Sequence, residues 1–406
     1  MYDILKLTVV FIGIVVAIRR RVFVGYTLFF AGLMIALFFQ LGVAKIFNAY
    51  REALLSERFI ALYLIIVLIT FLGRLLREIG YLNRLVAASR ELSGGARTAS
   101  AVIPSLVGLM PMPGGSLLSA PLVAEVLPKN RYRPEFVTAV NYWSRHVVEF
   151  CWPVYPGIIL SATLAAIPVG QVSLLQLPMT VLMIPIGIIF LIRKIKERNQ
   201  HGGHILRPAA KILLTVWPIL LAIILYAALP IRLLWAVASA VLLLIILERP
   251  SFEKIRSVAR EAFSVRLFIL LYGIISFQAM LEATGAVGAI PQLTTDVGLP
   301  AGVMIIAVCF VSGLLTGMVA AFVGLSYPIL AGYLYQPDIN LPNIFLAYIS
   351  GYFGMMLSPT HFCLVLTAEY FRADLGMVYR VLAVPLSVLF FAGLVLYLCG
   401  YPGSLR

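Results

Sequence analysis

Charged side chains are scarce in this sequence. Aspartate, glutamate, lysine and arginine account for 12 % of the 406 residues, whereas 62 % of the residues are hydrophobic and the mean hydropathy is +1.02. A water-soluble protein of this length could not bury so much apolar surface in one core. Long apolar runs separated by short basic segments instead predict an all-α polytopic membrane protein in the lipid bilayer.

Metal-binding and catalytic motifs are also missing from the sequence. The four cysteines have neither disulfide nor metal-ligand spacing, so we expect no metal and interpret them as small core residues. The sequence has no HExxH, no GxSxG and no paired acidic motif, and no loop is long enough for a catalytic domain. We therefore expect that the protein is not an enzyme and that it carries no cofactor.

The net charge of +14 does not predict a nucleic-acid partner, because the basic residues lie beside the apolar runs and form no basic groove or folded motif. About ten transmembrane helices are expected instead. They lie near residues 4–18, 22–40, 59–77, 134–165, 172–192, 209–229, 231–247, 266–284, 342–370 and 377–399.

The basic residues also predict how the chain is oriented. If the N-terminus lies outside, 24 of the 31 lysines and arginines fall on the cytoplasmic side of the expected helices. Cytoplasmic loops of membrane proteins carry such an excess of positive charge. We therefore expect a multi-pass protein of the cytoplasmic (inner) membrane with both termini outside.

Two further apolar segments, 99–127 and 301–333, are predicted to be re-entrant hairpins. As one straight helix, about 30 residues would measure roughly 45 Å, against a hydrocarbon core of about 30 Å. Folded in half at a central break, each segment could pass the midplane and return to the side it came from. If either segment were a full crossing, the basic loops that follow it would no longer lie on the cytoplasmic side.

The first of these segments is interrupted by "PMPGG" at residues 111–115, which predicts the tip of the hairpin. Pro111 and Pro113 end the inbound arm, while Gly114 and Gly115 allow the reversal and a close approach of a ligand. Ser116 is then a plausible N-cap of the outbound arm, whose free N–H groups would attract an anion. The alternative is a packing kink that binds no ligand.

A second break is predicted by "MLSPTHF" at residues 356–362. Ser358 can cap the helix that follows, and Pro359 suits its first position. Thr360 and His361 would then lie in the first turn, beside a second positive helix end. The flexible or polar residues near the tip of the matching hairpin are Gly317, Gly324 and Ser326.

The strongest polar cluster is "NYWSRHVVEFCWP" at residues 141–153. Arg145 and Glu149 are four residues apart, so on a helix they share a face and can pair, with His146 one step round. Paired ions at membrane depth line cavities or relay protons, which predicts ion coupling or a proton relay here. The alternative is that the helix starts late and that Arg145 and His146 extend to the cytoplasmic interface.

The two halves of the sequence contain similar short stretches in the same order. "LLREIGYLNRL" (75–85) precedes "MLEATGAVGAI" (280–290) by 205 residues, and "GLM" (108–110) precedes "GLL" (313–315) by the same interval. Further on, "CWPVYPG" (151–157) faces "LSPTHFC" (357–363). The shared order of these matches predicts an internal repeat.

We expect the first repeat to span residues 1–200 and the second to span 201–406. The first contains the hairpin 99–127 and a broken helix at 134–165, and the second contains the hairpin 301–333 and a broken helix at 342–370. Each repeat has an odd number of crossings, so the second copy is inverted in the membrane. Inverted repeats whose broken helices meet near the midplane are typical of secondary transporters.

The stretches "MPMPGGSLLSAPLV" and "GMMLSPTHFCLVLTAEYF" resemble an uncharacterised integral membrane family of the ion-transporter superfamily, which includes dicarboxylate, citrate and gluconate permeases. The resemblance implies a homodimer with an elevator mechanism and a substrate site at the two breaks. The Ser-Asn-Thr signature of the dicarboxylate symporters occurs at neither break. The substrate-binding positions that the resemblance implies are Pro113, Gly114, Gly115, Ser116, Trp152, Pro153, Ser358, Pro359, Thr360 and His361.

Together these features predict a cation-coupled secondary active transporter that moves a small organic anion. The two helix N-termini and Arg145 would supply positive potential, and Glu149 or His361 would hold the coupling cation, Na⁺ or H⁺. A sodium/proton antiporter of the same fold, in which Glu149 carries the exchanged ion, is the main alternative. An integral membrane enzyme or a channel is less favoured.

Overall fold

The computed structural model describes residues 2–91, 95–110, 115–128, 130–196, 206–286, 288, 291 and 298–403. Within these ranges the regular secondary structure is entirely helical, without a β-strand. The prediction of an all-α protein is therefore confirmed for the part of the chain that the structure describes.

Most of the helices are connected by short segments. In chain order they are α1 (Tyr2–Arg19), α2 (Val24–Phe38), α3 (Val43–Leu55), α4 (Glu57–Glu78), α5 (Tyr81–Glu91), α6 (Ala96–Gly108), α7 (Gly115–Val126), α8 (Pro134–His146), α9 (Pro156–Ala165), α10 (Val169–Phe190), α11 (Leu206–Ala228), α12 (Leu233–Glu248), α13 (Phe252–Ala262), α14 (Val265–Thr284), α16 (Ala301–Thr316), α17 (Val319–Ile329), α18 (Ala331–Leu334), α19 (Leu341–Met356), α20 (Phe362–Phe371) and α21 (Leu375–Leu398). A short 3₁₀-helix, Ile192–Lys194, follows α10.

Several segments are long and apolar enough to cross a membrane on their own. Among the described residues there are five, and they agree with five of the expected crossings. One of them, Phe252–Thr284, also includes α13 and bends at Phe263. Other expected crossings correspond to shorter apolar helices such as α2 and α12. Length and composition thus indicate a membrane protein, with fewer long spans than the ten expected. The five segments are Glu57–Glu78, Val169–Lys194, Ala210–Ala228, Phe252–Thr284 and Leu375–Leu398.

Three amphipathic helices, α3, α5 and α13, are not among the elements that the sequence predicts. Their charged residues lower the mean hydropathy of the segment, although apolar side chains recur on one face of each helix. In α13, Val258 and Ala262 are buried four residues apart on the helix that packs against α4, whereas Lys254 and Arg256 are exposed. A search for long apolar runs overlooks helices of this kind.

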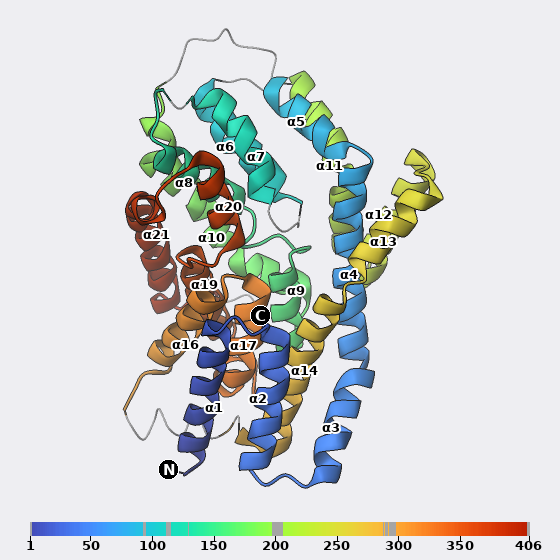
Figure 1. The fold of residues 1–406 in the computed structure, drawn as a ribbon, viewed down its shortest axis with the longest axis vertical. Coiled ribbons are helices and arrows are strands. Elements are labelled where there is room, and N and C mark those ends of the chain that lie inside the picture. Colours follow the sequence, from blue (N-terminus) through green and yellow to red (C-terminus); the bar gives the residue numbers. More distant parts are fainter. Residues whose placement is uncertain are drawn as a thin grey trace.

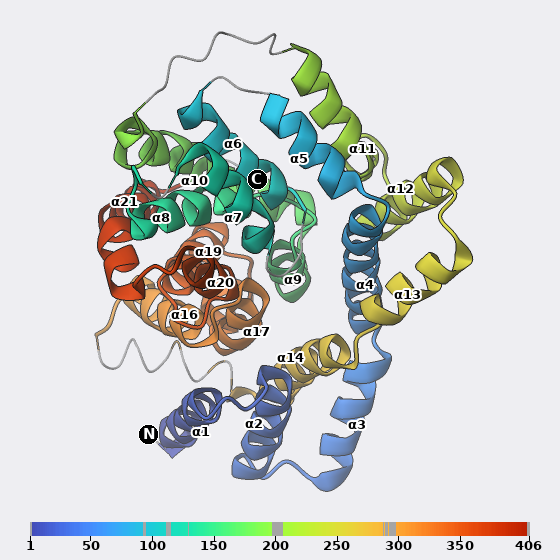
Figure 2. The same cartoon turned by 45° about the horizontal axis from the view of Figure 1, so that its top comes forward.

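The helices form two groups, which Figure 2 shows side by side. One group contains α6–α10 and α16–α21, and the other contains α1–α5 and α11–α14. Within the second group α2 and α3 pack against α14, while α12 and α13 pack against α4. Each half of the chain therefore covers a long helix of the other half.

The first group contains the interruptions expected within 99–127, 134–165, 301–333 and 342–370, and all four are present. Helices α6 and α7 pack against each other, as do α16 and α17, which gives two helical hairpins. Figure 1 shows α6 and α7 in the upper part of the molecule and α16 and α17 in the lower part. The second arm of each hairpin contacts the broken helix of the other half, because α7 packs against α20 and α17 against α9.

Glycine allows the first arm of each hairpin to approach its broken helix closely. A Cβ at Gly108 in α6 would overlap the carbonyl oxygen of Arg145 in α8, and a Cβ at Gly313 in α16 would overlap the carbonyl oxygen of Gly351 in α19. Small residues at helix crossings are the usual means of close packing in a membrane, where lipid removes the hydrophobic driving force. The backbone contacts at these two crossings therefore require glycine.

We expect Gly313→Ala to destabilise the protein, because the added methyl group would push α16 away from α19. Overpacking of this kind costs about 1–3 kcal/mol. Gly302→Ala is the matched control in the same helix, since its Cβ would lie 3.6 Å from the nearest atom, at ordinary contact distance. Thermal unfolding in detergent should show a lower midpoint for Gly313→Ala only. Equal midpoints for the two variants would contradict the close crossing.

Candidate functional site

The break between α8 and α9, residues 147–155, is tied to the first hairpin by side chains. The indole Nε1 of Trp152 donates a hydrogen bond to the carbonyl oxygen of Leu109 at 3.1 Å. The hydroxyl of Tyr155 donates to the carbonyl oxygen of Gly108 at 2.5 Å. Both acceptors lie at the end of α6, where the carbonyl groups of a helix lack intrahelical partners. Trp152 thus lies at the break, as expected, and Pro153 is buried beside it.

The break between α19 and α20, residues 357–361, is tied to the second hairpin in the same way. Ser358 Oγ donates to the carbonyl oxygen of Leu314 at 2.7 Å, near the end of α16. His361 Nδ1 donates to the carbonyl oxygen of Gly317 at 2.7 Å, at the turn between α16 and α17. Backbone acceptors inside the protein are therefore satisfied by side chains of the neighbouring break.

Hydrogen bonds also join the two halves of the chain between the first break and the second break. Tyr142 donates from its hydroxyl to the carbonyl oxygen of Met356 at 3.1 Å, and Tyr352 donates to the carbonyl oxygen of His146 at 3.2 Å. Ser116 Oγ, in the first turn of α7, donates to the carbonyl oxygen of Cys363 in the first turn of α20 at 2.9 Å. The N-terminal ends of α7 and α20 are thus held next to each other.

A buried amide extends this connection. Asn141 Nδ2 donates to the carbonyl oxygen of Ser116 at 3.0 Å and to Thr367 Oγ1 at 3.3 Å. Its Oδ1 accepts from Ser119 Oγ at 2.7 Å. Asn141, Ser119 and Thr367 are not among the predicted site residues, because the contact joins α7, α8 and α20, which are distant in the sequence.

Arg145 and Glu149 are both buried, with 2 % and 8 % of their surface exposed. Arg145 Nη1 lies 3.7 Å from Glu149 Oε2, and His146 Nε2 lies 3.5 Å from the same oxygen. The predicted pair is therefore confirmed, and the alternative in which Arg145 and His146 reach the interface is wrong. The pair does not share a helix face, however, because α8 ends at His146 and Glu149 lies in the turns that follow.

The guanidinium group of Arg145 lies against the first residue of α7. A Cβ at Gly115 would be 3.0 Å from both Nε and Nη2 of Arg145. A positive side chain is thus placed at the N-terminal end of a helix, where the backbone already contributes a partial positive charge. Glu149 is the carboxylate paired with this arginine.

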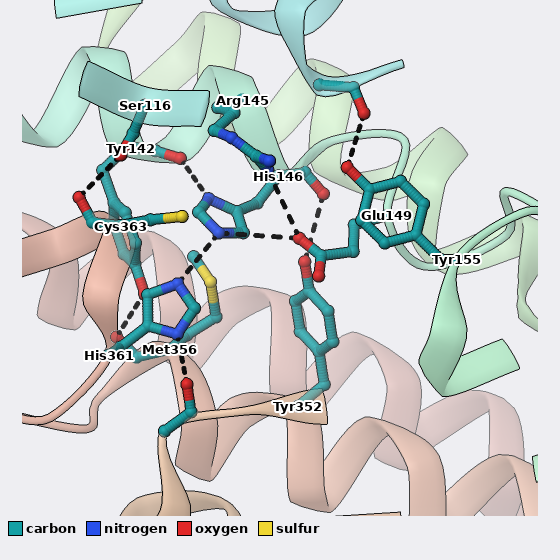
Figure 3. Close-up of polar contacts among 12 residues, drawn as sticks. Ser116, Tyr142, Arg145, His146, Glu149, Tyr155, Tyr352, Met356, His361 and Cys363 are labelled. Atoms are coloured by element: carbon teal, nitrogen blue, oxygen red, sulfur yellow. Dashed lines mark hydrogen bonds and ion pairs between the residues drawn. The ribbon is translucent and has the colours of Figure 1, made fainter. Parts of the chain in front are cut away.

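Two histidines, one from each half of the chain, face each other beside this pair. Figure 3 shows the rings of His146 and His361 with the sulfur of Cys363 directed toward them. The two Nε2 atoms are 3.1 Å apart, and the Cys363 sulfur and the two imidazoles offer ligand atoms that all lie within 4.8 Å of one another. The ring of Tyr142 packs against both imidazoles, with centroids 4.5 and 5.5 Å away.

These three residues could hold a metal ion, although their sequence spacing gives no sign of it. His146 ends α8, His361 precedes α20, and Cys363 lies in the first turn of α20. The interpretation of Cys363 as a small core residue is correct as to its burial but misses these two neighbours. A prediction of their proximity required the relative placement of two helices more than 200 residues apart.

Several predicted helix caps differ from the structure. Ser116 does not cap α7, because the helix already begins at Gly115, and the Ser116 hydroxyl donates to the carbonyl oxygen of Cys363. Ser358 does not cap α20, which begins at Phe362, after Pro359 and Thr360. The Ser358 hydroxyl instead accepts from the Thr360 N–H at 3.2 Å, which holds the chain in a turn.

The remaining predicted positions divide into three kinds. Pro359 and Thr360 are exposed, whereas the adjacent His361 is buried. Gly115 lies at the start of α7, next to Arg145. Pro113 and Gly114 lie outside the described residues.

A family model described as "Protein of unknown function (DUF401)" matches residues 4–399. This chain belongs to the DUF401 family. No curated protein matches it.

In this DUF401 protein we expect Gly317→Ala to disturb the second break. Gly317 has φ +62°, and a Cβ there would lie 2.8 Å from both the backbone nitrogen of His361 and Thr360 Oγ1. Gly285→Ala is the control, because Gly285 has φ +68° but no described atom lies within 4 Å of its Cβ. Both variants incur a left-handed backbone cost of about 1–2 kcal/mol.

The Gly317→Ala variant should lose more stability than the Gly285→Ala variant, because its methyl group also displaces His361. Thermal unfolding of the two purified variants measures the difference. If Gly285→Ala lowers the midpoint as much as Gly317→Ala does, the fit of the hairpin turn against the second break is not a structural requirement.

Proposed function

We propose that this protein is a cation-coupled secondary active transporter that moves a small organic anion across the cytoplasmic membrane. The observation that carries the proposal is that two interrupted helices, one from each half, meet at a buried cluster containing Arg145 and Glu149. Non-helical backbone at membrane depth is tolerated where it is buried in protein or lines a cavity, and broken helices of this kind form the substrate sites of secondary transporters.

Equivalent contacts at the two breaks support an internal repeat. Leu109 and Leu314, which are 205 residues apart, each accept a hydrogen bond from the break of their own half. The donors, Trp152 and Ser358, are 206 residues apart. The spacing of the acceptors is that of the sequence matches, so the repeat rests on contacts as well as on residue similarity.

The order in which the helices pack supports the same repeat over most of the chain. α1 packs against α2 and α11 against α12, and the pair α3–α14 corresponds to the pair α13–α4. In the same way α7–α20 corresponds to α17–α9. The two hairpins lie toward opposite ends of the molecule in Figure 1, as an inverted second copy requires. We include the inverted repeat in the proposal for these reasons.

The substrate class follows from the charge at the breaks. Arg145 and the adjacent N-terminal ends of α7 and α20 place positive charge and positive helix ends together. A carboxylate of a small organic anion would add the negative charge that Glu149 alone does not supply. Glu149 Oε2 is buried and accepts no hydrogen bond from the described residues, so it offers a negative group for a coupling cation.

The two groups of helices suggest how the site would be carried across the membrane. The group that contains both hairpins and both breaks would move as the transport unit, while α1–α5 and α11–α14 would form the fixed scaffold. This elevator movement and the assembly of two scaffolds in a homodimer belong to the proposal through the resemblance to the ion-transporter superfamily.

Reconstituted protein should exchange small organic anions. In proteoliposomes loaded with an unlabelled di- or tricarboxylate, we expect counterflow of the labelled compound that requires the coupling cation to be present. A pH-sensitive dye should be recorded in parallel. Proton flux driven by sodium without anion counterflow would overturn the anion assignment in favour of a sodium/proton antiporter.

Variants of the buried pair separate transport from folding. Arg145→Gln or Glu149→Gln alone leaves an uncompensated buried charge, which costs about 3–5 kcal/mol. The double variant removes both charges and should recover most of the thermal stability. We expect it to have no anion counterflow, because the positive group that recognises the substrate is gone. Counterflow at the wild-type rate in the double variant would remove this pair from the mechanism.

A further inference from the structure

The two facing histidines have a proton arrangement that their hydrogen bonds determine. His146 Nδ1 lies 2.6 Å from the carbonyl oxygen of Tyr142, and His361 Nδ1 lies 2.7 Å from the carbonyl oxygen of Gly317. A carbonyl oxygen can only accept, so each Nδ1 carries a hydrogen. In the neutral form of each ring, the lone pair is therefore on Nε2.

The two Nε2 atoms that carry these lone pairs are only 3.1 Å apart. Two neutral imidazoles would repel in this orientation, so the geometry is stable only with a cation between or beside the two nitrogens. A single shared proton would suffice for the histidines alone. A metal ion would also suffice, and the surroundings of the two rings discriminate between the two.

Three features favour a metal ion. A third donor, the sulfur of Cys363, lies within 4.8 Å of the ligand atoms of both histidines. A proton shared by the two histidines would not require this sulfur. Both ligand rings donate their other N–H to a backbone carbonyl, which is the usual outer contact of a metal-bound histidine. The separation of 3.1 Å between the two nitrogens is close to the distance of about 3.3 Å between two nitrogens on one tetrahedral Zn²⁺.

We propose that His146 Nε2, His361 Nε2 and Cys363 Sγ form a binding site for a transition-metal ion of the Zn²⁺ class. Two imidazoles and one thiolate suit such an ion. The thiol would release its proton on binding. Three protein ligands leave a fourth position, and Glu149 Oε2, 3.5 Å from His146 Nε2, is near enough to fill it.

The charges near the site are compatible with a divalent ion. The thiolate of Cys363 and the carboxylate of Glu149 together balance two positive charges. Arg145 contacts the carboxylate at 3.7 Å, so Glu149 lies within reach of both the guanidinium group and the metal position. The proposed site does not depend on the transport proposal, because it follows from the donor atoms alone.

Such an ion would connect the two halves of the chain. One ligand comes from the end of α8 and two come from the start of α20, and the Nδ1 of His361 also holds the tip of the second hairpin. Binding would therefore stabilise the contact between the first break and the second break. Metal-loaded protein should unfold at a higher temperature than protein stripped with a chelator.

Cobalt(II) is the direct probe of the site. Full-length protein in detergent, stripped of metal and titrated with Co²⁺, should bind one equivalent per chain. We expect the absorption of tetrahedral Co²⁺ together with a thiolate-to-cobalt charge-transfer band. Cys363→Ser should lose that band, and His361→Asn should weaken binding by more than about 100-fold, the upper range for loss of an outer contact.

Cys309→Ser is the matched control, because Cys309 is also buried but belongs to α16 and lies outside the cluster. It should keep the wild-type spectrum. Folded wild-type protein without a charge-transfer band, or an unchanged spectrum in Cys363→Ser, would overturn the metal site and leave a shared proton as the cation. Anion counterflow by metal-free protein would leave the transport proposal standing in that case, whereas metal binding without counterflow would reject transport alone.

Discussion

A helix that ends inside a membrane leaves backbone N–H and C=O groups that lipid cannot satisfy. In this protein the carbonyl groups at each hairpin accept hydrogen bonds from side chains of the neighbouring break, from Trp152 and Tyr155 in the first half and from Ser358 and His361 in the second. This requirement brings the hairpins and breaks together. It also gathers polar side chains at one buried point, where Arg145 and Glu149 lie.

The interruptions of the helices could be predicted because their signals are local. Apolar segments too long for one crossing, together with proline and glycine in their interior, predict the positions of α6–α9 and α16–α20 to within a few residues. The buried pair of Arg145 and Glu149 is also a local signal, since two charges four residues apart in an apolar run are seldom both solvated. These features required no knowledge of how the helices pack.

The partners of the site residues could not be predicted, because they lie in distant parts of the chain. Cys363 meets His146 only after α8 and α20 are placed side by side, and no spacing in the sequence records that contact. The predicted caps failed for a related reason. Helices α7 and α20 begin at Gly115 and Phe362, so neither serine, Ser116 or Ser358, lies at an N-cap position. Their hydroxyl groups donate to carbonyl groups of segments that are distant in the sequence.

Thiol labelling from each side of the membrane tests the central proposal, that the two hairpins enter the membrane from opposite faces. In a cysteine-free background, single cysteines would replace Thr98 or Arg131, which flank the first hairpin, and Leu299 or Asp338, which flank the second; all four positions are exposed. A membrane-impermeant reagent should label the first two from one side and the last two from the other. Labelling of Thr98 and Arg131 positions from opposite sides, or of all four from the same side, would contradict the account.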